Sequence, residues 1–104
     1  MKSQLPAKSV SKLMKQASSV SALLKHLSHP QRLLILCALA DGEKAVGEIE
    51  EVCGASQSAV SQFLKRMRDD GLVDFRRDGQ FVLYEIADSR LIDLIKSLYR
   101  IYCD

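Results

Sequence analysis

The stretch ASQSAVSQFLKRMRDDG, residues 55–71, spaces its apolar residues three and four apart, whereas LVDFRRDGQFVLYEI, residues 72–86, alternates apolar and polar residues. The first spacing is typical of an amphipathic helix and the second of strands. Ser56 is a preferred residue at a helix N-cap, and Gly71 is of the type that most often follows a helix end. Asp-Gly at 78–79 separates two alternating runs, which indicates a tight β-hairpin. The sequence therefore predicts a helix followed directly by a hairpin.

Helical spacing recurs on both sides of this unit. Proline is favoured in the first turn of a helix, as at Pro30, and glycine after a helix end, as at Gly54. Asp88 is of a residue type preferred at a helix N-cap. The additional helices predicted in this way are 9–27, 30–40, 46–53 and 89–103. Together these elements predict a fold that is mainly α with a β-hairpin wing (α+β), a winged helix-turn-helix.

The short helix, the turn at Gly54 and the longer helix form a candidate helix-turn-helix, an arrangement that places its second helix in the DNA major groove. Val60, Leu64 and Met67 share one face of that helix and are expected in the core. The opposite face is polar, and Gln62 can bond adenine through both ends of its amide. The hairpin adds basic side chains suited to phosphates or the minor groove. The alternative is a solvated helix beside a surface hairpin. The predicted DNA-binding residues are Ser56, Gln57, Ser58, Ser61, Gln62, Lys65, Arg76, Arg77 and Gln80.

Length and composition limit the number of domains, the possible partners and the expected compartment of the protein. The 104 residues suffice for one domain, expected at 9–104 after a flexible segment 1–8. The net charge of +2 permits a nucleic-acid partner without demanding one. We see no secretory signal and no apolar run long enough to span a membrane, so we expect a cytoplasmic protein without a membrane partner. Thiols rest reduced in that compartment, and three cysteines cannot all pair within one chain.

The last predicted helix is unusually apolar, because eight of the twelve residues from Leu91 to Tyr102 are apolar. This surface is wider than one core-facing stripe. A homodimer would cover it and present two recognition helices to a near-palindromic operator in double-stranded DNA. In the alternative, the extra face packs on the first helix of the same chain. The predicted interface residues are Leu13, Ala17, Val20, Leu91, Leu94, Ile95, Leu98 and Tyr102.

Residues 23–103 resemble the ArsR/SmtB family of bacterial repressors. The similarity is carried by LLKHLSHPQRLLILCAL at 23–39, SQSAVSQFLKRMRDDGLV at 56–73 and RRDGQFVLYEI at 76–86. The resemblance implies a winged helix that dimerises through its first and last helices and whose repression is relieved by a ligand. An enzyme is not expected, because Cys–His catalysis needs a paired base in a cleft. No cofactor is expected either.

Four residues near these motifs are expected to have structural roles, in packing, capping or surface solvation. Phe63 stands where many relatives carry His, and we expect it to pack on the hairpin, with contact to a thymine methyl as the alternative. His26 and His29 flank a helix junction, where capping and surface solvation would explain them. Cys53 is expected to be a small buried residue of the short helix.

The metal sites familiar in this family lack their ligands here. Ala45 and Gly47 occupy the positions of a Cys-Val-Cys motif, and the last-helix site keeps Asp88 and Asp93 but has no His, since none follows His29. No metal is therefore predicted. The alternative, a new zinc site with about four ligands, would have to combine Cys37, Cys103, His26 and His29.

The remaining cysteines match one subgroup of the family. Cys37 lies in ILC at 35–37 and Cys103 in YC at 102–103, a combination that resembles the persulfide- and redox-responsive repressors. The resemblance implies that a persulfide, a polysulfide or an oxidant links the two thiols, and that linking lowers DNA affinity. Without the resemblance, core packing would explain Cys37. The alternatives are a constitutive or anti-silencing regulator, a metal-responsive repressor with a non-standard site, and a protein-interaction module.

Overall fold

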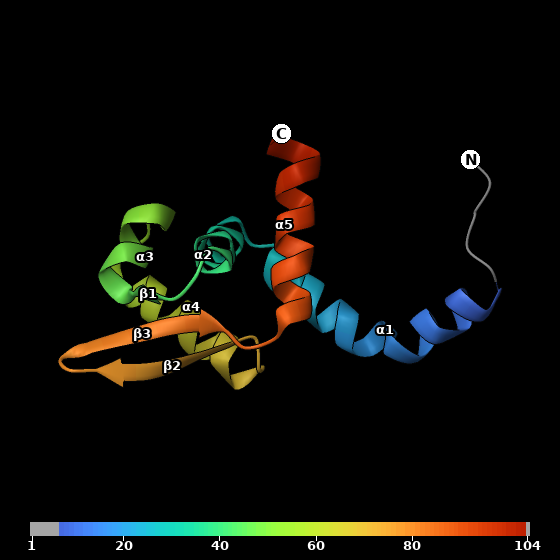
Figure 1. The fold of residues 1–104 in the computed structure, drawn as a ribbon, viewed down its shortest axis with the longest axis horizontal. Coiled ribbons are helices and arrows are strands. Elements are labelled where there is room, and N and C mark those ends of the chain that lie inside the picture. Colours follow the sequence, from blue (N-terminus) through green and yellow to red (C-terminus); the bar gives the residue numbers. More distant parts are fainter. Residues whose placement is uncertain (1–6, 104) are drawn as a thin grey trace.

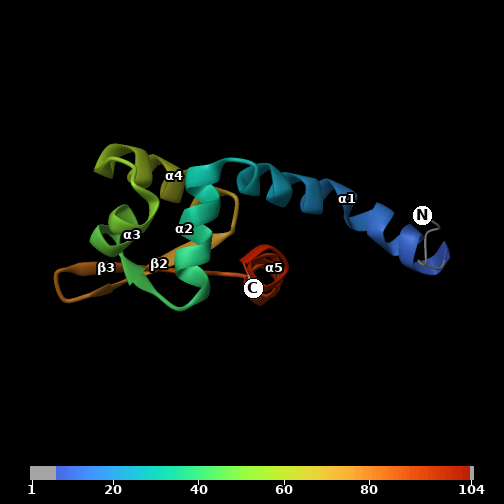
Figure 2. The ribbon, with the colours of Figure 1, turned by 90° about the horizontal axis from the view of Figure 1, so that it is seen from above.

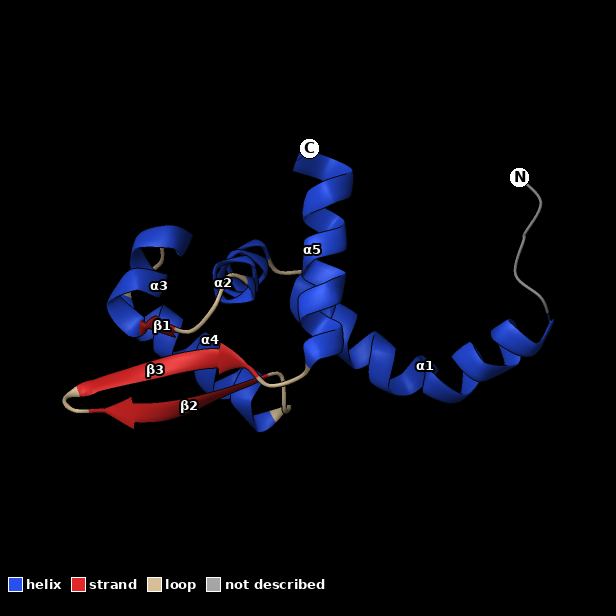
Figure 3. Ribbon diagram, viewed as in Figure 1, coloured by secondary structure: helices blue, strands red, loops and turns tan. Residues whose placement is uncertain are grey.

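The computed structural model describes residues 7–103, which form five helices and one antiparallel sheet (Figure 1; Figure 3). The helices are α1 (Ala7–Leu27), α2 (Pro30–Ala40), α3 (Val46–Cys53), α4 (Gln57–Asp69) and α5 (Ser89–Cys103). The strands are β1 (Lys44–Ala45), β2 (Val73–Asp78) and β3 (Phe81–Ile86). This is a winged helix-turn-helix, as the sequence predicts. Of the expected flexible segment 1–8, Ala7 and Lys8 belong to α1 and the rest lies outside the described residues.

The helix ends follow the local chemistry that predicted them. The Ser56 hydroxyl accepts a 3.2 Å hydrogen bond from the backbone N–H of Ala59 and so caps α4. Gly54 ends α3 with a φ of 67°, in the left-handed region that favours glycine. The Asp88 carboxylate accepts a 2.9 Å bond from the backbone N–H of Arg90 at the start of α5. The predicted boundaries of these three helix ends are confirmed.

The wing is a sheet of three strands in the order β1-β3-β2, and the sequence predicted only the hairpin. Asp78 pairs with Phe81, so Gly79 and Gln80 form the loop, one residue later than the expected 78–79. Gly79 has a φ of 62° at the first loop position, as in a type II′ turn. β1 pairs with β3 but has two residues, too few to show a period in the sequence.

The core fills the space enclosed by α2, α3, α4, α5 and the inner ends of β2 and β3. Side chains at most 2 % exposed are Ile35, Leu36, Leu39, Ile49, Val60, Leu64, Met67, Val73, Leu91 and Ile95. Leu23 and Leu27, near the end of α1, are the apolar residues of this helix that pack against the core. The helix therefore projects from the body on the side opposite the wing (Figure 1; Figure 2). No helix among residues 7–103 has the length and apolar character that crossing a bilayer requires.

Candidate nucleic-acid interface and cysteine site

Helix α4 presents one polar face to solvent. Val60, Leu64 and Met67 have no exposed surface, as expected of its core face, which turns the opposite face outward. All of the predicted DNA-binding residues on α4 and the wing are exposed. Two of them already have partners within the chain: the Ser56 hydroxyl caps α4, and the Arg76 guanidinium bonds to Glu43. An exposed face of serines, Gln62 and Lys65 has the donors and acceptors that base edges require.

The two arginines of the wing differ in their partners. The Arg76 Nε donates a 2.9 Å hydrogen bond to a carboxylate oxygen of Glu43, from the loop that precedes β1. This bond lowers the pKa of Glu43 and raises that of Arg76. Arg77 makes no ion pair with any residue in the described range 7–103. Arg77 is therefore the guanidinium that is free to meet a phosphate, whereas Arg76 would have to share its donors with Glu43.

The C-terminal end of α4 is tied to the wing by contacts that local spacing did not reveal. The Arg68 guanidinium lies 4.1 Å above the ring of Phe75 on β2, and its Nε is 3.6 Å from a carboxylate oxygen of Asp74. The Phe75 ring in turn packs 5.6 Å from the ring of Tyr84 on β3. These contacts set the wing against the same helix that carries the polar face.

His26 is part of a buried polar network, which corrects the expectation of surface solvation. It is 4 % exposed, and its Nε2 lies 2.6 Å from the carboxylate of Asp70, directly after α4. Its Nδ1 lies 3.2 Å from the guanidinium of Arg32, near the start of α2. Because arginine only donates, Nδ1 is the acceptor in the contact with Arg32, and Nε2 donates to the Asp70 carboxylate. The network joins α1, α2 and the end of α4.

His29 and Phe63 contact each other at the junction of α1 and α2. The His29 Nδ1 accepts a hydrogen bond from the backbone N–H of Gln31 and so caps α2, as expected. Its ring centroid is 4.9 Å from that of Phe63, with the planes tilted by 56°. Phe63 is half-buried against the core. It packs, as expected, and the ring that it contacts is that of His29.

The three cysteines lie in different surroundings, and all three are free thiols. Cys53 is 6 % exposed in the core, so its predicted packing role is confirmed. Cys37 is half-buried on α2, and Cys103 is exposed in the last turn of α5. Burial raises the pKa of Cys37, and the negative charges of Cys103 and Asp41 raise it further. No disulfide joins Cys37 to Cys103, and the structure does not place the two thiols together as a pair.

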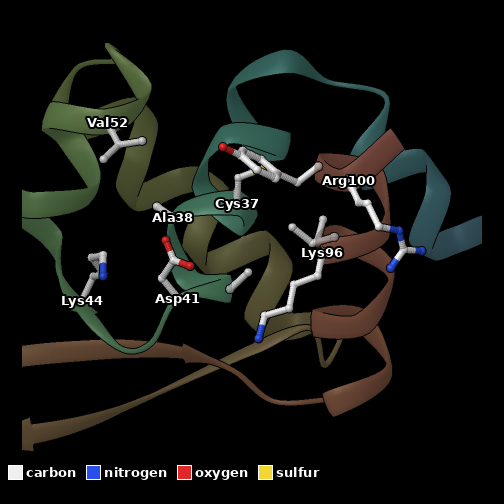
Figure 4. A pocket seen from close by; sticks show the side chains of 10 residues that line it. Cys37, Ala38, Asp41, Lys44, Val52, Lys96 and Arg100 are labelled. Atoms are coloured by element: carbon white, nitrogen blue, oxygen red, sulfur yellow. The ribbon is translucent and has the colours of Figure 1, made fainter. Parts of the chain in front are cut away.

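Cys37 lines a half-open cavity of about 740 Å³ between α2, α3 and α5 (Figure 4). Ala38 from α2, Val52 from α3 and Ile95 from α5 form apolar walls, and Tyr99 lies on the α5 side. The charged side chains around it are Asp41, Lys44, Lys96 and Arg100. The cavity thus combines a thiol, an apolar lining and a charged rim.

The four residues of the alternative zinc site do not form a cluster. His26 is bonded to Asp70 and Arg32, and His29 caps α2. Among residues 7–103, no three His, Cys, Asp or Glu side chains come together as metal ligands would.

The residues predicted for a dimer interface differ in how far the single chain buries them. Leu91 and Ile95 are 2 % exposed in the core of the single chain, which accounts for their burial without a partner. Leu94 and Leu98 are half-buried against the same core. On α1, Leu13 is 52 % exposed and Ala17 is also exposed, whereas Val20 is half-buried. Tyr102, at the end of α5, is 80 % exposed.

Comparison with known proteins matches residues 29–74 to the family of bacterial regulatory proteins called the arsR family. The chain is 44 % identical to the HTH-type transcriptional regulator YgaV of Escherichia coli over 90 % of this chain and 96 % of that protein. Two solved structures are similar along most of their length. One is the transcriptional repressor BigR of Xylella fastidiosa, with a TM-score of 0.83, 38 % identity, and 90 % of this chain and 96 % of that one covered. The other is reduced HlyU of Vibrio cholerae, with a TM-score of 0.82 and 39 % identity. This comparison covers 89 % of this chain and 98 % of the HlyU chain.

Proposed function

The chain belongs to the ArsR family of bacterial DNA-binding transcriptional regulators, and we propose that it is a homodimeric repressor that leaves its operator when Cys37 and Cys103 become linked. The observation that supports the switch is that Cys37 lines an open cavity whose other wall is α5, the helix that carries Cys103 in its last turn. One of the two is exposed and the other lines an open cavity, so a reagent has access to both.

DNA is read by α4 in this proposal. Ser58, Ser61, Gln62 and Lys65 face base edges from the exposed side of the helix, and Ser56 and Gln57 approach the backbone at its N-terminus. Arg77 meets a phosphate beside the groove, and Gln80 at the wing tip extends that contact. Arg76 contributes after exchanging its bond to Glu43. The phosphate contacts supply affinity that falls with salt, and the base contacts supply the operator preference.

A persulfide, R–S–SH, can serve as the oxidant that links Cys37 to Cys103, with all atoms and electrons accounted for. One cysteine thiolate attacks the outer sulfur; a new S–S bond forms, the bond from that sulfur to R–S breaks, and RS⁻ leaves with the electron pair. The second thiolate then attacks the cysteine sulfur of the protein persulfide, forms the Cys37–Cys103 disulfide and expels HS⁻. Two thiolates are thereby oxidised by two electrons, and the sulfane sulfur is reduced to HS⁻.

The link would act through α5. It would fix the last turn of α5 to α2, and α2 packs against α3, the first helix of the helix-turn-helix. A seam between two protomers that includes α1 and the end of α5 would carry this change to the spacing of the two recognition helices. The exposed apolar side chains Val10, Leu13, Met14 and Tyr102 support such a seam.

Cysteine variants test the switch. Cys37→Ser and Cys103→Ser proteins are expected to bind operator DNA as the reduced wild type does, and both are expected to resist release by a persulfide donor. Linking should weaken wild-type binding by roughly 5- to 150-fold, the range of typical allosteric coupling. The measurement is an operator mobility shift with and without donor, with mass spectrometry of the linked peptides.

Cys53→Ser is the matched control, since its thiol is buried in the core and its release should resemble that of the wild type. Release of Cys37→Ser by the donor would overturn the switch. DNA binding that no donor or oxidant changes would instead favour a constitutive regulator.

A further inference from the structure

The cavity beside Cys37 has the size and lining of a small-molecule site. Its volume of about 740 Å³ lies within the range of ligand pockets. Ala38, Val52 and Ile95 give it apolar walls from three different helices, and the half-buried Cys37 is the thiol among its lining residues. Walls from three helices make the cavity a feature of the tertiary fold and not of one loop.

The rim of this cavity is predominantly positive. Lys44 contributes a cation from β1, and Lys96 and Arg100 contribute two from α5, against the single carboxylate of Asp41 (Figure 4). None of the three cations makes an ion pair with a residue in the described range 7–103. In Figure 4 the Arg100 guanidinium points away from the middle of the cavity, so Lys44 and Lys96 are the main rim charges. Figure 4 shows Asp41 between the two lysines, and with one carboxylate against three cations the rim keeps a net positive charge. Such a rim around an apolar hollow favours a ligand that is apolar in its body and anionic at one end.

We propose that this cavity binds a small sulfur compound that carries a carboxylate. The carboxylate lies between Lys44 and Lys96, and the sulfur-bearing body covers the apolar walls next to Cys37. The choice of a sulfur compound rests on the proposed thiol switch, whereas the choice of a carboxylate rests on the rim alone. With a persulfide bound there, Cys37 is the thiolate that attacks first, and Cys103 at the end of α5 is the one that resolves.

The rim would also favour the reaction itself. When Cys37 takes the outer sulfur, the departing RS⁻ gains a negative charge inside the cavity, where Lys96 stabilises it. A neutral donor of the same size would fill the apolar part without using the lysines. The structure therefore assigns Lys44 and Lys96 to the selection of anionic over neutral donors.

Reversible binding tests the cavity without any thiol chemistry. The probes are N-acetyl-S-methylcysteine, an unreactive anion, and its neutral amide, titrated into the reduced full-length protein by NMR or calorimetry. The anion is expected to bind more tightly, by roughly two- to fivefold for each of the two lysines that it meets. The preference should disappear in a Lys44→Gln/Lys96→Gln variant and shrink in high salt. Lys15→Gln, a matched loss of charge on exposed α1, should keep it.

Equal affinity of the wild type for anion and amide would overturn the proposal, and so would a preference that survives in the double variant. A second experiment compares how fast the persulfide of N-acetylcysteine and that of its amide link Cys37 to Cys103. A faster reaction of the anion, lost in the double variant, supports the role in donor selection, and equal rates contradict that role. If neither donor links the thiols, the proposed switch fails, and the binding experiment still decides whether the cavity takes carboxylates.

Discussion

Partial burial affects the pKa of the Cys37 thiol most, and the acidic groups of Cys103 and Asp41 affect it to a smaller extent. Burial disfavours the thiolate, and each negative charge disfavours it further, so the pKa of Cys37 lies above its ordinary value. The thiolate is the reactive form, and a raised pKa leaves little of it at neutral pH. Cys37 should therefore resist general oxidants and depend on a reagent that is brought to it, as the rim of the cavity would do.

Asp41→Asn is expected to speed the alkylation of Cys37 between pH 7 and 8. Removing the carboxylate lowers the pKa of Cys37 towards its ordinary value, and a lower pKa gives more thiolate at any pH below it. The measurement is the rate of iodoacetamide labelling at Cys37, followed by peptide mass spectrometry. Asp93→Asn, the same change at an exposed position of α5, should leave the rate unchanged. Equal rates in all three proteins would show that Asp41 has no influence on this thiol.

The pairing of His26 with Asp70 could not be predicted from the sequence, whereas the core face of α4 could. A histidine at a helix junction suggested capping or solvation, but its partner Asp70 lies 44 positions away in sequence. No spacing within one helix can reveal such a pairing, because it depends on how α1 crosses the end of α4. The core face of α4 was predictable, since the 3.6-residue period alone separates it from the polar face.

Among the elements, α4 is held at both ends by side chains. Ser56 caps its N-terminus, and Asp70 ties its C-terminal end to the buried His26 on α1. Arg68 adds a contact from its last turn to Phe75 on the wing. A helix that is fixed at each end keeps its exposed face at a constant angle to the rest of the domain, which reading a groove requires.

Asp70→Ala is expected to lower the free energy of unfolding by about 1–3 kcal/mol, because it leaves the buried Nε2 of His26 without an acceptor. The Asp70 side chain is 46 % exposed, which favours the lower end of that range. Urea denaturation measures the difference. Asp69→Ala should change stability by less than about 0.5 kcal/mol, since Asp69 is exposed. Equal losses in the two variants would mean that water replaces Asp70 at no cost.

The helices and the hairpin were predictable because caps, glycines and a change of period mark them locally. The third strand was not, because β1 consists of two residues whose pairing with β3 is purely tertiary. The hairpin loop was placed one residue early, because Asp-Gly favours one turn type and the strand register selects another. The bond between Arg76 and Glu43 was missed for the same reason as β1, since it joins the wing to a distant loop.

In the whole molecule, α1 and the body make very different use of their apolar residues. The body buries a core of apolar side chains within one chain, including Leu91 and Ile95 of α5, and exposes others such as Tyr102 at the end of α5. α1 projects from it with Val10, Leu13 and Met14 at 40 %, 52 % and 71 % exposure. An amphipathic helix that extends away from its own core needs another surface to pack against. A second copy of the chain, meeting it about a two-fold axis, is the partner that the proposed function supplies.

Leu13→Glu is expected to convert the proposed dimer into a monomer that still folds. The exposed Leu13 contributes little to the core of its own chain, so the free energy of unfolding of the monomer should change little. In a two-fold seam the substitution buries two unpaired carboxylates, at a cost of several kcal/mol, so the dissociation constant should rise by roughly 100-fold or more. Sedimentation velocity measures the assembly state, and an operator mobility shift should show a parallel loss of affinity. Ser11→Glu adds the same charge on the other side of α1 and should leave the dimer intact. A Leu13→Glu protein that stays dimeric would place the seam away from α1, and a monomeric wild type would exclude the dimer altogether.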